Sequence, residues 1–219
     1  MNWFVLIALL CAGADWFAVA RANKKIEYVF KPATMLAIIA MACVWMQGPH
    51  DEWFAWFILA GLVLSLAGDV LLLFPRAIFF LIGLGAFLLA HVAYILGMNQ
   101  TLPPPDAYVL LLPIGIVCAL YLARVVRVLR ARRENNLVAP VAVYGVLISF
   151  MLFSAWATLF RPEWSMTRRA WVIAGAMLFY LSDGMLAWHR FVKSSRIVQV
   201  SVMITYHLGQ MALAAAMVL

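Results

Sequence analysis

The sequence predicts an all-α fold, a polytopic membrane helix bundle of about eight transmembrane helices that form one domain over residues 1–219. The composition is 67% hydrophobic and 11% charged, whereas soluble domains are about 45–50% apolar and about 25% charged. The apolar residues form eight long segments separated by short polar stretches. Such segments are expected to be helical, because lipid offers no partner for unpaired backbone groups.

The eight predicted helices follow one another with short connections. They are expected near residues 3–20, 31–46, 53–73, 77–98, 107–126, 138–160, 168–189 and 197–218. Most of them approach the roughly 20 residues that a helix needs to cross a bilayer, and the second is the shortest. The proline-rich stretch Thr101–Asp106 is expected to be a rigid turn between two helices.

The positive charges predict the orientation of the bundle. Thirteen of the sixteen Lys and Arg residues fall in or beside the first, third, fifth and seventh connections. Because basic residues stay on the cytoplasmic side, we expect these odd connections in the cytoplasm and both termini outside. The short connections suggest a bacterial cytoplasmic membrane. Outside the apolar segments no basic cluster is interleaved with aromatic residues, so no nucleic-acid binding is expected.

Two aspartates lie inside segments that otherwise suit a membrane. Asp69 ends the stretch Ser65-Leu66-Ala67-Gly68-Asp69, and Asp183 lies 114 residues later, within Leu181-Ser182-Asp183-Gly184. A carboxylate there costs about 2.5–3.5 kcal/mol, so each marks a functional site unless it forms a structural hydrogen bond between helices. A similar motif around an aspartate thus recurs four segments later, which suggests a parallel internal repeat of two four-helix halves (4+4). The alternative is that the motif recurs by chance in apolar sequence.

The predicted spans place several polar side chains in one layer of the bilayer. At 1.5 Å per residue, both aspartates lie about 7–9 Å below the inner interface. The side chains expected in this cytoplasmic-side layer are Asp15, Lys31, Asp69, Tyr144 and Asp183. Lys31 is either an interface anchor that reaches lipid phosphates or a positive charge that holds one aspartate ionised.

The two histidines inside the apolar segments are expected at other depths. His207, next to Tyr206, lies about 15 Å from the inner interface. His91, like Tyr94, is placed deeper, toward the outer side. His91 is therefore not expected to be the direct partner of Asp69. Alternatively, these side chains bond a neighbouring helix, as polar residues in membrane bundles commonly do.

Five groups of residues lie along the chain in a definite order. They are Lys31, Ser65-Leu66-x-Gly68-Asp69, Phe80-x-x-Gly83-x-x-x-Phe87-x-x-Ala90-His91-x-x-Tyr94, Gly175-x-x-Leu178-Phe179-x-x-Ser182-Asp183-x-x-Leu186-Ala187, and Tyr206 with Gln210. In order and spacing this set resembles the lysoplasmalogenase (YhhN-like) family. The resemblance implies an eight-helix membrane hydrolase that cleaves the vinyl ether bond of lysoplasmalogens. His207 departs from the aromatic residue that the family favours there, so no catalytic role is expected for it.

The chemistry of that reaction suits two buried carboxyl groups. Protonation of the β-carbon of a vinyl ether produces an oxocarbenium ion, which water then captures. One carboxylic acid must remain protonated near neutral pH, while a second, ionised carboxylate stabilises the cation. Burial raises the pKa of an aspartate, and a neighbouring carboxylate raises the pKa of one member of the pair further, so one can stay protonated while the other is ionised. Glycosidases meet the same problem with two carboxylates about 6.5–9.5 Å apart. We predict Asp69 and Asp183 as the catalytic pair, with either one as the acid.

The predicted partners are lipids. The substrate implied by the resemblance is a 1-alkenyl-glycerophosphocholine or -ethanolamine, and the products are a fatty aldehyde and the glycerophospho-alcohol. Its phosphate is expected at the interface near Lys31, with its chain among the helices. The residues predicted to bind it are Lys31, His91, Tyr94, Tyr144, Tyr206 and Gln210. No metal or organic cofactor is expected, and no oligomeric state is predicted.

Three other classes of protein share these features. A proton-coupled transporter or lipid flippase would also use repeated halves and the carboxylates Asp69 and Asp183, although the polar layer lies on one side only. A metal-dependent lipid hydrolase would need His91 and His207 as ligands with the aspartates, without any HxxxH or HExxH motif. A structural protein would use the aspartates only for hydrogen bonds between helices.

Overall fold

The computed structural model describes residues 3–48 and 51–219, and every regular element in this part of the chain is helical. The eight long helices are α1 (Trp3–Ala20), α2 (Lys24–Trp45), α3 (Glu52–Leu73), α4 (Ala77–Met98), α5 (Leu111–Ala131), α6 (Val138–Ala157), α7 (Met166–Ala187) and α8 (Arg196–Ala215). Each lies in a helical span long and apolar enough to cross a membrane. The predicted fold class is confirmed, and the internal repeat stays a prediction.

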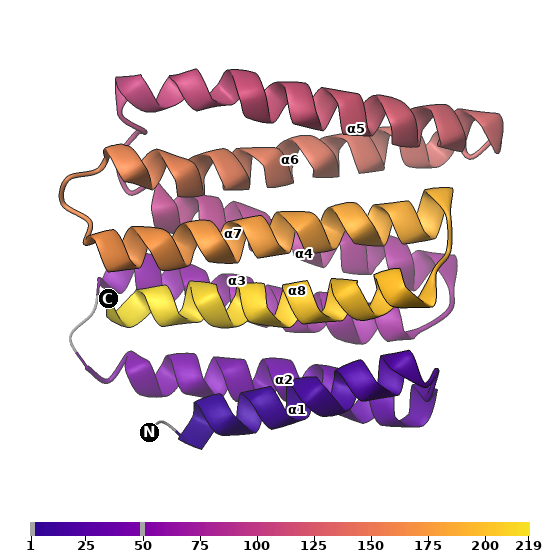
Figure 1. Cartoon of the computed structure of the whole chain (residues 1–219), viewed down its shortest axis with the longest axis horizontal. Coiled ribbons are helices and arrows are strands. Elements are labelled where there is room, and N and C mark those ends of the chain that lie inside the picture. Colours follow the sequence, from indigo (N-terminus) through magenta and orange to yellow (C-terminus); the bar gives the residue numbers. More distant parts are fainter. Residues whose placement is uncertain (1–2, 49–50) are drawn as a thin grey trace.

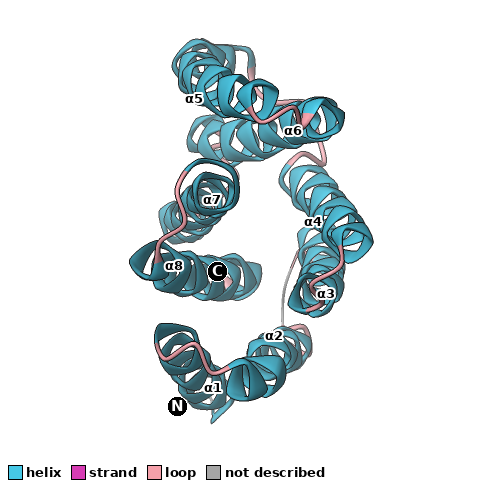
Figure 2. Cartoon of the chain, turned by 90° about the vertical axis from the view of Figure 1, so that its right-hand side faces the viewer, coloured by secondary structure: helices cyan, strands magenta, loops and turns pink. Residues whose placement is uncertain are grey.

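The helices form a bundle of antiparallel neighbours. Figure 1 shows them running side by side, with α5 and α6 at one edge and α1 and α2 at the other. In the end view of Figure 2, α7, α8 and α1 lie on one side of the bundle and α4, α3 and α2 on the opposite side. The two sides face each other, so polar residues on α3 and α4 can meet residues on α7 and α8.

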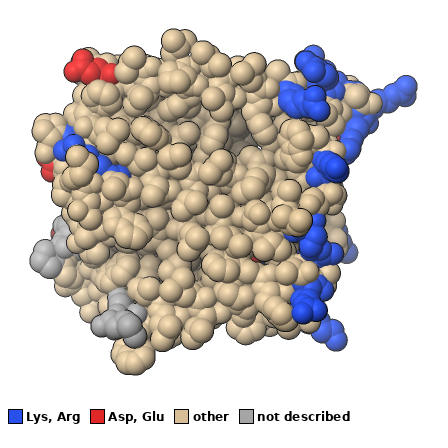
Figure 3. Space-filling model, in the orientation of Figure 1, with Lys and Arg blue, Asp and Glu red and all other residues tan. Residues whose placement is uncertain are grey.

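The charges gather at one end of this bundle. Figure 3 shows most of the visible Lys and Arg side chains at the end that carries the α1–α2, α3–α4, α5–α6 and α7–α8 connections, while the middle of this face is free of charge. This separation is the pattern expected of helices whose centres lie in hydrocarbon. We call this charged end the basic end.

Local sequence signals start several of the helices. The side chains of Asn23, Asp51 and Ser165 accept hydrogen bonds from the backbone N–H groups of Ile26, Phe54 and Arg168 at 3.3, 3.1 and 3.1 Å. These bonds satisfy donors that the first turn of a helix leaves free. The caps therefore define where α2, α3 and α7 begin.

Two helix boundaries differ from the predicted ones in ways that matter for the site. Helix α2 begins at Lys24 instead of residue 31, because Asn23 caps a polar first turn that hydropathy alone does not count as membrane. Helix α7 continues into a π-helical turn, η4 (Trp188–Val192). Asp183 thus lies nine residues, or about 13 Å, before the end of this helical stretch, deeper than predicted.

Glycines bring the hairpin helices into close contact. A Cβ atom on Gly175 of α7 would lie 2.8 Å from Leu213 Cγ and 3.0 Å from the Gly209 carbonyl oxygen of α8. A Cβ on Gly68 would lie 2.6 Å from the Phe87 ring, and on Gly61 2.1 Å from the Tyr94 ring. Small residues of this kind let membrane helices approach closely. They also leave room for two aromatic rings of the site.

We expect a Gly175→Ala variant to lose stability. The added methyl group must displace backbone atoms of α8, and overpacking of this kind costs about 1–3 kcal/mol. Gly85→Ala is the matched control, because its Cβ would meet nothing within 4 Å and alanine favours a helix over glycine. Thermal unfolding in detergent should show a lower midpoint for Gly175→Ala only. Equal midpoints would contradict the close α7–α8 contact.

Candidate active site

Asp69 is held at the centre of the bundle by two donors. Its side chain is 1% exposed, its Oδ1 lies 3.1 Å from Lys31 Nζ, and its Oδ2 accepts a hydrogen bond of 2.5 Å from the Tyr206 hydroxyl. An ammonium group and a hydroxyl can both donate, so the carboxyl group is the acceptor of both contacts. This geometry favours an ionised Asp69.

The true start of α2 explains why Lys31 reaches Asp69. With Lys24 as its first residue, the helix carries Lys31 about two turns inside, where its side chain is almost fully buried. A lysine in the first turn would extend to the headgroups instead. Of the two predicted roles for Lys31, the structure therefore favours the charge that holds an aspartate ionised.

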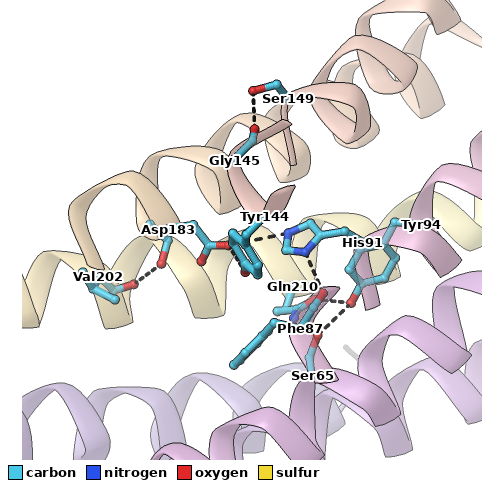
Figure 4. Close-up of polar contacts among 11 residues, drawn as sticks. Ser65, Phe87, His91, Tyr94, Tyr144, Gly145, Ser149, Asp183, Val202 and Gln210 are labelled. Carbon is cyan, nitrogen blue, oxygen red and sulfur yellow. Dashed lines mark hydrogen bonds and ion pairs between the residues drawn. The ribbon is translucent and has the colours of Figure 1, made fainter. Parts of the chain in front are cut away.

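Asp183 lies in a different environment on α7. The Tyr144 hydroxyl of α6 donates a hydrogen bond to its Oδ2, and His91 Nε2 of α4 lies 3.6 Å from the same oxygen. Figure 4 shows these three side chains converging from three helices. Within residues 3–48 and 51–219, no Lys or Arg lies within ion-pair distance of Asp183. The two aspartates are therefore not equivalent.

The histidine beside Asp183 has a defined tautomer. His91 Nδ1 lies 2.6 Å from the Phe87 carbonyl oxygen, which can only accept, so Nδ1 carries a hydrogen. In the neutral ring Nε2 then presents a lone pair toward the Asp183 carboxyl group. The distance of 3.6 Å is longer than a hydrogen bond, and Nε2 has no hydrogen-bond partner among the described residues. His91 is therefore a neighbour of the Asp183 carboxyl group with an unused acceptor.

An aromatic cluster lies between the two carboxyl groups. The ring of Phe179 packs edge-on against those of Phe87, His91, Tyr94 and Tyr206, with centroid distances of 6.3, 4.8, 6.1 and 5.4 Å. These rings separate the Asp69–Tyr206 pair from Asp183 and His91. Aromatic faces also attract cations.

A third polar group completes the interior. The Tyr94 hydroxyl donates to Gln210 Oε1 at 2.7 Å and lies 3.4 Å from Ser65 Oγ. Figure 4 shows this group on the far side of His91 from Asp183. It links α3, α4 and α8 just beyond the aromatic cluster. Gln210 is fully buried, and its Nε2 has no hydrogen-bond partner among the described residues.

Three neighbouring hollows lie on the Asp183 side of the site, and Asp183 lines two of them. The first, which we call the vestibule, has a volume of about 820 Å³ at the basic end, and its charged or titratable lining residues are Lys24, Glu27, Lys31, His189, Arg190 and Arg196. The second, the chamber, measures about 50 Å³, and its lining includes Leu72, Phe80, Phe87, Tyr144, Asp183 and Arg190. The third, the side groove, measures about 380 Å³, and its lining includes Val117, Leu122, Tyr144, Ile148, Leu181 and Asp183.

Shared lining residues place these hollows in series. Arg190 lines the vestibule and the chamber, as do Leu72 and Phe80. Asp183 and Tyr144 line the chamber and the side groove. Asp183 therefore lies between the chamber and the apolar side groove, and the chamber connects it to the charged vestibule. Asp69 lies behind Lys31 and Tyr206, outside the residues that line these hollows.

The structure brings together all eight predicted site residues, in three groups. The first is Asp69 with Lys31 and Tyr206, the second is Asp183 with Tyr144 and His91, and the third is Tyr94 with Gln210. The predicted separation in depth between His91 and the aspartates is wrong for Asp183. Asp183 lies farther from the end of its helical stretch than expected because η4 extends that stretch, and His91 Nε2 comes within 3.6 Å of its carboxyl group.

Two further polar residues inside the helices, His207 and Asp15, lie apart from these groups. His207 Nδ1 accepts a hydrogen bond of 3.1 Å from Trp16 Nε1. Asp15 is fully buried, and neither of its carboxyl oxygens has a hydrogen-bond partner in the described part of the chain. Within that part, no three His, Cys, Asp or Glu side chains are grouped as metal ligands.

Three residues near the site were not predicted to take part in it. Phe87 and Phe179 form the aromatic wall, and both belong to the motifs quoted above, so their spacing relative to the aspartates was the available signal. Arg190 lines two of the hollows, but its sequence position at an inner helix end looks like that of any orienting charge. Only the fold distinguishes it from the other basic residues.

The fold and this site define a polytopic helical membrane protein with two buried carboxyl groups, of which Asp183 lines a chamber and an apolar groove next to a basic vestibule. The match of the YhhN family model to residues 26–217 shows that the chain belongs to the YhhN family. The family resemblance predicted from the motifs is thereby confirmed.

Several relatives carry the name lysoplasmalogenase. The chain is 30% identical over 183 residues to lysoplasmalogenase TMEM86B of Homo sapiens, covering 82% of this chain and 72% of that protein. It is 29% identical over 170 residues to the Rattus norvegicus protein of that name, covering 78% of this chain but 64% of the relative. A lysoplasmalogenase of Mycobacterium tuberculosis is 27% identical over 194 residues, covering 87% and 69%. No solved structure matches the chain.

Proposed function

We propose that this chain is a membrane hydrolase that cleaves the vinyl ether bond of lysoplasmalogens, giving a fatty aldehyde and glycerophosphocholine or glycerophosphoethanolamine. Relatives named lysoplasmalogenase support this assignment. The observation that carries it is the position of Asp183, between a basic vestibule and an apolar groove. A single-chain phospholipid has its ether bond at the corresponding point, between a charged headgroup and a hydrocarbon chain.

We assign the general acid to Asp183, since it lines the chamber and has the unused acceptor of His91 3.6 Å away. In the first step the proton moves to the β-carbon of the vinyl ether, and the electron pair of the double bond forms the new C–H bond. The ether oxygen then shares the positive charge as an oxocarbenium ion. Water adds to the carbon next to that oxygen and returns a proton to the Asp183–His91 pair. The resulting hemiacetal passes a proton to the glycerol oxygen as that C–O bond breaks, which releases the aldehyde.

We assign Asp69 the role of a permanent negative charge. Lys31 and Tyr206 hold it as a carboxylate, on the other side of the aromatic wall from Asp183. A preorganised charge of this kind stabilises a cation that develops in the transition state. The rings of Phe87 and Phe179 add attraction for the same cation. Asp69 thus acts through space, while Asp183 contacts the substrate.

The phosphate group of the substrate is assigned to Arg190. Lys31, which was expected near the phosphate, is already paired with Asp69. Arg190 is exposed in the vestibule, lines the chamber next to Asp183, and lies with its guanidinium carbon 4.8 Å above the Phe80 ring. Arginine can bind phosphate oxygens through two parallel hydrogen bonds. The basic end then faces the cytoplasm in this proposal, and the substrate headgroup lies on that side.

We expect Arg190→Ala to weaken substrate binding more than turnover. A hydrogen bond to a charged group contributes about 1.5–3 kcal/mol, so KM should rise about tenfold or more while kcat changes little. Arg127→Ala is the matched control, because Arg127 is an exposed arginine of α5 outside the lining of the three hollows. Steady-state kinetics of aldehyde release would measure both variants. An unchanged KM in Arg190→Ala would remove Arg190 from the headgroup site.

The reaction itself is tested with two substrates that differ only in one double bond. Purified protein in detergent is given a 1-alkenyl lysophosphatidylethanolamine or its saturated 1-alkyl analogue, and aldehyde release is followed with and without a chelator. We expect aldehyde only from the alkenyl lipid, because the β-carbon of the alkyl ether is saturated and cannot accept a proton. The rate should be the same with the chelator. No aldehyde from folded protein would refute the proposal. Loss of activity to the chelator would favour a metal-dependent hydrolase instead.

A further inference from the structure

The side groove between α5, α6 and α7 differs from the vestibule in what it could bind. Its walls are almost entirely apolar side chains, such as Val117, Leu122, Ile148 and Leu181. The polar groups beside it are turned away to backbone carbonyls. The Tyr121 hydroxyl donates to Gly184 O, and Cys118 Sγ donates to Gly145 O at 3.5 Å. The groove therefore offers a ligand little besides apolar contact.

The groove faces lipid because α5 is the most peripheral helix. Figures 1 and 2 show α5 at the edge of the bundle, resting on α6. Val117 of α5 and Leu181 of α7, on opposite walls, are 54% and 51% exposed, and these helices are spans of hydrocarbon character. What reaches this surface in a bilayer is lipid chains. A ligand can enter the groove sideways without leaving the membrane.

The inner end of the groove sets a second requirement. Asp183 and Tyr144 line it together with the chamber, and the chamber leads on to Arg190 and the vestibule. An occupant must therefore place a reactive group at Asp183, a charged group toward the vestibule and an apolar tail toward lipid. A helix from another protein is too wide to pass Asp183 into a chamber of about 50 Å³. A single-chain lipid meets all three conditions.

We propose that the side groove binds the 1-alkenyl chain of the substrate and admits it from the bilayer between α5 and α7. This inference rests on the proposed function for the identity of the chain, but the groove itself can be tested by binding alone. The chain lies in the groove, the vinyl ether lies at Asp183 and the phosphate lies at Arg190. The contacts of the groove then set the preference of the protein for chain length.

The proposal predicts a defect that depends on chain length. Val117→Trp and Leu181→Trp place a large ring in the groove from opposite walls, whereas Leu120→Trp adds the same ring to an α5 position that is 70% exposed and outside the groove lining. Lost apolar contacts change rates by about tenfold or more. We expect both groove variants to lose about tenfold in kcat/KM on a C16 alkenyl substrate and little on a C4 one. Leu120→Trp should match wild type on both.

Two measurements separate this proposal from the proposed function. The first is the kinetic comparison above. Equal losses of kcat/KM on the C16 and C4 substrates, or no loss on either, would overturn the groove assignment. The second is calorimetric binding of a C16 1-alkyl lysophosphatidylethanolamine, which has no bond to cleave. Weaker binding in the groove variants than in Leu120→Trp would support lipid binding in the side groove, even if wild type releases no aldehyde. The absence of aldehyde would refute only the proposed hydrolase activity. Unchanged binding in the groove variants would refute the groove.

Discussion

Replacing Asp183 with Asn is expected to reduce aldehyde release by about 10²- to 10⁴-fold, which is the usual contribution of a general acid–base group. The amide has the size of the carboxyl group and can still accept the hydrogen bond from Tyr144. Its nitrogen can donate to the lone pair of His91 Nε2, so the local fold is retained. What the variant lacks is a proton that can move to carbon. Single-turnover measurements of aldehyde formation would isolate this step from product release.

A matched substitution controls for the loss of a negative charge. Asp106→Asn changes an exposed aspartate at the opposite end of the bundle from the vestibule and should retain wild-type activity. The thermal midpoint of Asp183→Asn should also stay close to wild type. Full activity in folded Asp183→Asn protein would remove Asp183 from the mechanism. A large drop in midpoint together with activity would instead indicate a structural role.

The second large effect is expected on stability, from breaking the buried pair of Lys31 and Asp69. Lys31→Met leaves the Asp69 carboxylate 1% exposed and without its cation. Removing one partner of a buried ion pair costs about 3–5 kcal/mol, because the remaining charge is left uncompensated. We expect a much lower thermal midpoint in detergent and loss of activity. Adding Asp69→Asn to Lys31→Met should restore most of the stability, since no buried charge then remains, but not the activity.

An exposed lysine pair provides the control for this experiment. Lys24 Nζ lies 2.7 Å from Glu27 Oε2 on the same helix, with 67% of its side chain exposed. Surface pairs contribute about 0–1 kcal/mol, so Lys24→Met should barely change the midpoint. If Lys31→Met were no more destabilising than Lys24→Met, the buried pair would not hold Asp69 as a carboxylate. If the double variant recovered activity, Asp69 would have no role in the reaction.

The helices themselves were largely predictable from residue order. Seven of the eight predicted starts agree with the structure to within a few residues, because the length of an apolar run determines a helix in lipid. The exception is α2. It begins at Lys24 because Asn23 caps its first turn, which consists largely of polar residues. The π-helical turn after α7 was also missed, because a change in helical winding leaves no mark in hydropathy.

The site residues were predictable for a different reason. Asp69, Asp183 and Lys31 are costly inside a membrane, so their presence alone indicates a function or a partner. The partners were not predictable. Whether Lys31 pairs with Asp69 or Asp183, and whether His91 meets Asp69 or Asp183, depends on which helices face each other. Hydropathy carries no information on that choice, because lipid-facing and buried apolar residues have the same composition.

The sequence by itself determined a membrane bundle, its basic end and a small set of ionisable residues near that end. The tertiary structure alone decided that these residues form two unlike centres, one in which Asp69 pairs with Lys31 and one in which Asp183 lies beside His91 and Tyr144. It also decided that only Asp183 faces the hollows. The physical reason is that charge and hydropathy set the depth of each residue in the bilayer, whereas the pairing of side chains depends on the rotation and packing of the helices.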